Sequence, residues 1–176
     1  MCVIMKRILL AAFILVCLCS PASAELRQVY VIVNMGNAPV EILESRQCHA
    51  RKKDHICSQV KYKNRTDKNI EALAITMIYF DAFNDKLDGV RGISTGLLNA
   101  QGESAGYWSV YVGEPGFVKT AVAFVSAVRF LRNEEVWKAD VDEVVKVAAD
   151  MPELNFLLET EMLEIEKKCE IIKSLY

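Results

Sequence analysis

The sequence predicts a mainly β fold, an antiparallel β-sandwich followed by C-terminal α-helices. Between residues 25 and 140, short runs rich in Val, Ile, Tyr and Phe are separated by turn residues, which is typical of regularly spaced antiparallel strands. Near Asp140 the spacing of the apolar residues changes from the strand period to the helical period. We therefore expect three parts: an N-terminal leader (1–24), a sandwich domain (25–140) and a helical C-terminal region (141–176).

Residues 1–24 have the three parts of a secretory signal peptide. Lys6 and Arg7 form a basic start, residues 8–19 are all apolar, and Ala22-Ser23-Ala24 is a small-residue cleavage site. The apolar run is shorter than the roughly 20 residues of a membrane-spanning helix, which favours cleavage over a retained N-terminal anchor. We therefore expect an exported protein of the periplasm or the extracellular space, with no membrane span after cleavage.

The charge of the chain argues against two classes of partner. The full chain has 21 Lys and Arg and 23 Asp and Glu, and loss of Lys6 and Arg7 with the leader leaves 19 basic residues and a net charge of −4. A nucleic-acid-binding protein would instead show a basic stripe, so we expect no nucleic-acid partner. The mild acidity also gives no support for binding to anionic membrane surfaces.

Turn residues divide the sandwich region into short predicted strands. Residues 70–83 are apolar on both faces, apart from Glu71 and Asp81, so we expect a central strand that is buried on both sides. Residues 84–106 contain five of the eight glycines, which predicts only weak strands there. The other predicted strands are 26–33, 40–49, 56–63, 107–112, 117–131 and 136–138.

Two short motifs in this region resemble the FxLYD-type modules of bacterial secreted proteins. The first is residues 60–66, in which a strand runs into a turn at Asn64. The second is Met77-Ile78-Tyr79-Phe80-Asp81, in which a strand ends in aromatic residues followed by Asp. The resemblance implies an immunoglobulin-like β-sandwich over residues 40–138 at most. It implies no chemistry, because these modules have no established activity.

The cysteines predict one disulfide bond in the exported protein. Three of the six cysteines lie outside the leader: Cys48, Cys57 and Cys169. In an oxidising compartment an odd number predicts one bond and one remaining thiol. If the polar loop of a hairpin is 51–54, Cys48 stands directly opposite Cys57 and within reach of it. The same register pairs Glu44 with Lys61 across the strands.

A metal site is the alternative use of the same cysteines. His55 shares a face of the hairpin with Cys48 and Cys57, whereas His49 is expected on the other face and Leu43 on the core side. Two thiolates and one imidazole suit zinc or copper. Cys48, His55 and Cys57 would then serve a metal-binding or redox-sensing protein.

The helical region begins with a predicted N-cap. Asp140 can cap a helix over 141–149, with Glu143 in the capping-box position, and Pro152 is allowed in the first turn of a second helix. Apolar residues then form a heptad-like stripe: Leu158, Met162, Ile165, Cys169, Ile172 and Tyr176. The stripe either packs on the sandwich or forms an interaction helix for an unknown protein partner or for self-association, in which Cys169 would join two chains.

One hydrolase motif occurs in the chain, but its context does not fit. Gly92-Ile93-Ser94-Thr95-Gly96 matches the G-x-S-x-G elbow, which needs a following helix and a later histidine. Both histidines precede Ser94, and residues 97–102 form a poor helix. We therefore expect an exported, non-catalytic binding or interaction protein without a cofactor.

Overall fold

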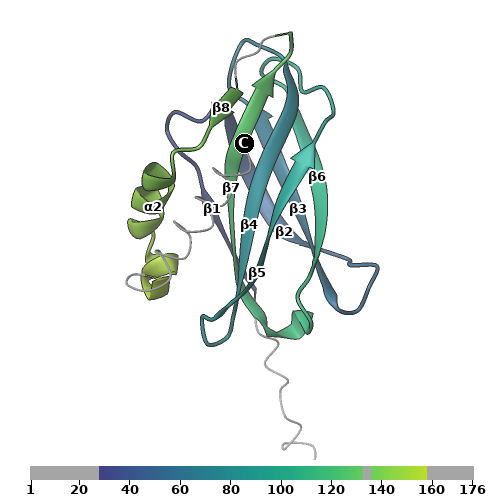
Figure 1. Cartoon of the computed structure of the whole chain (residues 1–176), viewed down its shortest axis with the longest axis vertical. Coiled ribbons are helices and arrows are strands. Elements are labelled where there is room, and N and C mark those ends of the chain that lie inside the picture. The colour runs from purple at the N-terminus through teal and green to yellow at the C-terminus, as the bar shows by residue number, and fades with distance from the viewer. Residues whose placement is uncertain (1–27, 133–135, 158–176) are drawn as a thin grey trace, which may run out of the picture.

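The computed structural model describes residues 28–132 and 136–157, which form two facing β-sheets with an α-helix packed at one side (Figure 1). The elements in chain order are β1 (Val29–Val33), β2 (Val40–Cys48), β3 (His55–Asn64), β4 (Ile70–Asp81), β5 (Lys86–Ser94), β6 (Glu103–Tyr111), the 3-10 helix η1 (Pro115–Phe117), β7 (Val118–Phe130), β8 (Val136–Lys138), α2 (Val141–Ala149) and the 3-10 helix η2 (Pro152–Leu157). Within these described ranges, no helix is long and apolar enough to cross a membrane. The predicted leader lies outside them.

The sheets have five and three strands. The order of the larger sheet is β1-β7-β4-β5, with β8 also paired to β7, and the order of the smaller sheet is β2-β3-β6. This confirms the mainly β, two-sheet sandwich. The expectation of wholly antiparallel strands is wrong for one pair, because β1 runs parallel to β7. The alternation within β1 shows that it is a strand but carries no information about which strand it joins.

The central strand expected in residues 70–83 is confirmed as β4, which is buried on both faces. Its two faces contribute to different apolar clusters. One cluster fills the space between the sheets and includes Ile56, Val60, Ile75, Met77, Tyr79 and Val125. The other lies between the outer face of the five-stranded sheet and α2 and includes Val33, Ile78, Phe80, Phe124, Val144 and Leu154. β7 is buried on both faces for the same reason.

The glycine-rich region 84–106 contains the whole of β5, a full strand where the sequence predicts only weak ones, and the start of β6, which includes most of the strand predicted over 107–112. β5 and β6 are edge strands of different sheets, and the indole of Trp108 on β6 lies against them both. A Cβ atom at Gly92 of β5 or at Gly106 of β6 would overlap the indole. These two glycines therefore make room for a tryptophan that closes one edge of the sandwich.

The helix α2 begins where the sequence predicts it. The side chain of Asp140 caps it by accepting a hydrogen bond from the Asp142 backbone N–H at 3.1 Å. Glu143 accepts a hydrogen bond from Asn37 Nδ2 at 2.6 Å, so it fixes the helix to the turn after β1. The described part of the predicted second helix is η2, a 3-10 helix whose Leu154 is buried.

Candidate functional site

The β2–β3 hairpin carries the predicted disulfide. Cys48 and Cys57 are directly opposed, with Cα atoms 5.0 Å apart, and their sulfur atoms are bonded. Glu44 Oε2 lies 2.7 Å from Lys61 Nζ, and this hydrogen bond holds the pKa of Glu44 below its usual value. The prediction of the hairpin register is therefore confirmed at both positions.

Two details of this hairpin differ from the prediction. Leu43 is not on the core side, because a bulge between Ile42 and Glu44 turns its side chain outward and leaves it 43% exposed. His49 lines the same hollow as the disulfide, because β2 ends at Cys48 and the alternation of faces ends with it.

The hollow beside the disulfide has a volume of about 630 Å³ and contains both histidines. The His55 ring lies 2.8 Å from Asp54 Oδ1 through Nδ1 and packs edge-on against Tyr111. This hydrogen bond lowers the pKa of Asp54. In the bonded form neither cysteine is a thiolate, and the described residues include no group of three or more side chains placed to hold a metal ion. A zinc or copper site would therefore need a reduced hairpin.

The G-x-S-x-G motif does not form a nucleophile elbow. Gly92 and Ser94 lie within and at the end of β5, and the next regular element is the strand β6 rather than a helix. Ser94 Oγ accepts a hydrogen bond from Tyr62 Oη at 3.2 Å. Ser94 is thereby tied to the opposite sheet instead of standing on a strand-to-helix turn.

A groove of about 380 Å³ crosses the outer face of the five-stranded sheet beside β8. Three small side chains form its floor: Ala72 and Ala74 on β4, and Ala127 on β7. Ile93 of β5 and Val136 of β8 form its apolar walls and are 56% and 39% exposed. This groove is not among the sites that the sequence predicts.

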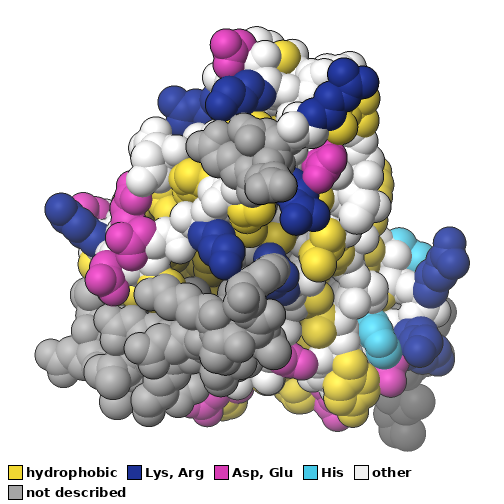
Figure 2. Space-filling view, turned by 45° about the horizontal axis from the view of Figure 1, so that its top comes forward, with side chains coloured by type: hydrophobic (Ala, Val, Ile, Leu, Met, Phe, Trp, Pro, Cys, Tyr) yellow, Lys and Arg dark blue, Asp and Glu magenta, His cyan; other side chains and the backbone are white. Residues whose placement is uncertain are grey.

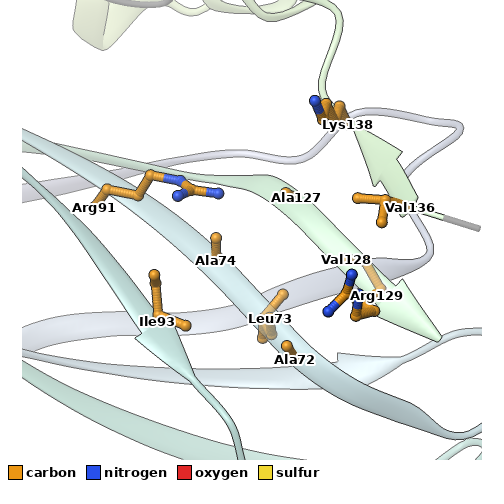
Figure 3. A pocket seen from close by; sticks show the side chains of 10 residues that line it. All are labelled: Ala72, Leu73, Ala74, Arg91, Ile93, Ala127, Val128, Arg129, Val136 and Lys138. Carbon is orange, nitrogen blue, oxygen red and sulfur yellow. The ribbon is translucent and has the colours of Figure 1, made fainter. Parts of the chain in front are cut away.

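Three cationic side chains surround the apolar floor, and we call the site the cationic groove. Figure 3 shows Arg91 extending from β5 across Ala74 toward β7, with Arg129 and Lys138 on the other side. The Glu71 carboxylate lies 3.6 Å from Arg129 Nε and is an acid at the rim. Figure 2 shows Lys and Arg side chains next to hydrophobic side chains on one face of the molecule. The groove therefore combines apolar area with cationic side chains.

The strand register explains why these residues meet. Ala74 pairs with Ile93 on one side and with Ala127 on the other, and Ala127 in turn pairs with Lys138. Ala72 pairs with Arg129. Directly opposed residues share a face of a sheet, so β4 and β5, which are neighbours in the chain, build one surface with the later pair β7 and β8. No single segment contains a signal from which the groove could be predicted.

The predicted interaction stripe, from Leu158 to Tyr176, lies outside the described residues. The structure therefore places neither Cys169 nor the other apolar residues of the stripe. The described chain ends with η2, next to α2 on the outer face of the five-stranded sheet. Self-association through the stripe stays a prediction.

Comparisons with known proteins add little to the two-sheet sandwich. No family model matches the chain, and no curated protein matches it in sequence. A member of the DUF1425 family from Shewanella sp. pv-4 aligns with 49% of this chain and 75% of its own, at 9% identity and a TM-score of 0.36. A target of the Northeast Structural Genomics Consortium aligns with 57% of this chain and 78% of its own, at 12% identity and a TM-score of 0.34. A β-glucosidase from Kluyveromyces marxianus aligns with 56% of this chain and 14% of its own, at 12% identity and a TM-score of 0.28. Similarities at this level carry no argument about function.

Proposed function

We propose that this protein is an exported, non-catalytic binding protein that takes an apolar, acidic segment of a partner protein into the cationic groove. The observation that carries the proposal is the placement of Arg91, Arg129 and Lys138 around a floor of alanines. α2 packs on another part of this side of the sheet, whereas Ile93 and Val136 at the groove are exposed. A bound segment would remove that apolar area from water.

The chemistry of the groove selects the partner. Small side chains on the floor let a bound peptide approach the sheet closely, and Ile93 and Val136 offer contacts to its apolar side chains. Carboxylates of the peptide would form charge-assisted hydrogen bonds with Arg91, Arg129 and Lys138. Apolar contacts supply most of the affinity in such sites, and the charges fix orientation and specificity.

Two observations support export. The sequence before residue 25 has the pattern of a secretory signal peptide, and Cys48 and Cys57 form a disulfide bond. Disulfide bonds of this kind persist in oxidising compartments such as the bacterial periplasm. We therefore propose that the partner is met in the cell envelope or outside the cell.

A peptide titration of the full chain tests the proposal. The probe is a short labelled peptide in which leucine alternates with glutamate, followed by fluorescence anisotropy. Wild-type protein should bind it, and the Arg129→Glu, Lys138→Glu double variant should bind at least tenfold more weakly. The control is Lys61→Glu, Lys63→Glu, which reverses two paired cations on the other sheet.

Three results decide the outcome. A peptide with lysine in place of glutamate should not bind. Equal loss of affinity in the control variant, or no loss in the groove variant, would contradict the proposal. If charge reversal disturbs the fold, as thermal unfolding would show, Arg129→Gln with Lys138→Gln provides a milder variant that should still weaken binding.

A further inference from the structure

We infer that residues 158–166 of the same chain occupy the cationic groove in the free protein, so that a partner must displace them. This inference rests on the proposed function, because it names a resident ligand for the same site. The segment binds the groove of its own chain. Exchange of the segment between two copies of the protein would give a different result in the tests below.

The composition of this segment matches the groove. Residues 158–166 contain four glutamates and no basic residue, and the first lysine follows at position 167. Between the glutamates stand four large apolar side chains: Leu158, Met162, Leu163 and Ile165. The segment thus offers both the carboxylates that Arg91, Arg129 and Lys138 would pair with and the apolar groups that the alanine floor would accept.

The path of the described chain brings the segment to the correct face. Lys138 at the rim of the groove is followed by α2, which packs on the outer face of the five-stranded sheet through Val144 and Ala148. η2 follows, and its Leu154 is buried in the same cluster. The chain therefore leaves the described structure at Leu157 while still on the face that carries the groove.

The length of the segment itself is sufficient. Residues 158–166 would span about 13 Å as a helix at ~1.5 Å per residue, which equals the length of the nine-residue α2, and about 30 Å in an extended form at ~3.3 Å per residue. A segment that turns back after Leu157 can therefore pass alongside α2 and reach the region of Lys138. The alanine floor of the groove lies on the same face of β4 as Ile78, which is buried in the cluster that α2 covers.

The first test removes the carboxylates of the segment in the full chain. The variant carries Glu159→Gln, Glu161→Gln, Glu164→Gln and Glu166→Gln. Its matched control carries Glu103→Gln, Glu114→Gln, Glu153→Gln and Glu170→Gln. The probe is a labelled peptide with the sequence of residues 158–166. If the resident segment competes with the probe, the first variant should bind the probe at least tenfold more tightly than wild type, and the control should bind like wild type.

The second test uses hydrogen exchange, followed by mass spectrometry. In the wild-type full chain, backbone amides of residues 158–166 should be protected, and Arg129→Glu with Lys138→Glu should remove the protection. Unprotected amides together with an unchanged probe affinity in the glutamine variant would overturn the inference. Protection that appears only as protein concentration rises, with a dimer in analytical ultracentrifugation, would overturn binding within one chain.

The two proposals fail in different ways. If neither the leucine–glutamate peptide nor the probe binds to wild type or to the glutamine variant, the proposed function fails. If the probe binds in a manner that depends on Arg129 and Lys138 but the segment is unprotected, only the inference fails.

Discussion

Ser58 Oγ lies 2.9 Å from Tyr79 Oη in the apolar space between the two sheets. Ser58 belongs to β3 of the smaller sheet and Tyr79 to β4 of the larger one, and both residues are fully buried. This hydrogen bond is therefore a polar contact that fixes the position of one sheet relative to the other. Tyr79 Oη also lies 3.7 Å from Met77 Sδ, which is a weak acceptor.

Removal of Ser58 should destabilise the protein. Ser58→Ala leaves the buried Tyr79 hydroxyl without its strong partner, and we expect a loss of about 1–3 kcal/mol in the free energy of unfolding. Urea denaturation measures it. The double variant Ser58→Ala, Tyr79→Phe removes both polar groups and should recover part of the loss. A double variant that is less stable than Ser58→Ala would contradict the account.

The stability should fall in strong base. Burial raises the pKa of Tyr79 to about 12, although the Ser58 hydrogen bond acts in the opposite direction, and burial also raises the pKa of Tyr30. Because the unfolded tyrosine ionises near 10.0, the stabilising contribution is complete below that pH and is lost as the pH rises toward about 12. Unfolding temperatures across this range should fall less steeply in Tyr79→Phe, with the remaining slope due in part to Tyr30. Equal slopes would refute the prediction.

The hairpin disulfide should contribute to stability. Cys48→Ala with Cys57→Ala opens a loop with a sequence separation of 9, and we expect a loss of about 2–3 kcal/mol. Denaturation with and without reductant checks this: reductant should lower the stability of the wild type by a similar amount and leave the variant unchanged. Alkylation of both cysteines in unreduced, freshly exported protein would show that the bond does not form.

The packing of Trp108 should be sensitive to single methyl groups. Gly106→Ala places a Cβ atom within the volume of the indole, so the ring must move, at a cost of about 1–3 kcal/mol. Tryptophan fluorescence should shift along with the loss of stability. Gly96→Ala is the control, because a Cβ atom there meets no heavy atom within 4 Å. A similar effect of both substitutions would contradict the packing argument.

The turn after β3 depends on one amide. Asn64 is fully buried, its Nδ2 donates to the backbone oxygens of Lys68 and Asn99, and its Oδ1 accepts from the Thr66 backbone N–H. Asn64→Asp would place a carboxylate oxygen opposite two carbonyl oxygens, so we expect a loss of about 3 kcal/mol or more. Thermal unfolding measures it, and Asn99→Asp at an exposed position should have little effect.

The features that could be predicted from the sequence are local ones. The hairpin register, the Cys48–Cys57 bond and the Asp140 cap depend on residues that are close in the chain. The prediction for Leu43 is wrong because a bulge inserts one residue without a turn signal. The cationic groove depends on the registers of four strands at once, and the local pattern of a strand does not state its partner.

The parallel pairing of β1 with β7 has a consequence for the order in which the chain acquires its structure. β7 is the ladder partner of β1 among the described strands, and every residue from β2 to β6 lies between them in the chain. A chain that crosses a membrane N-terminus first must therefore deliver nearly the whole domain before its first strand can be inserted. Until β7 is available, β1 has no ladder partner among the described strands, and an unpaired strand edge is prone to aggregation.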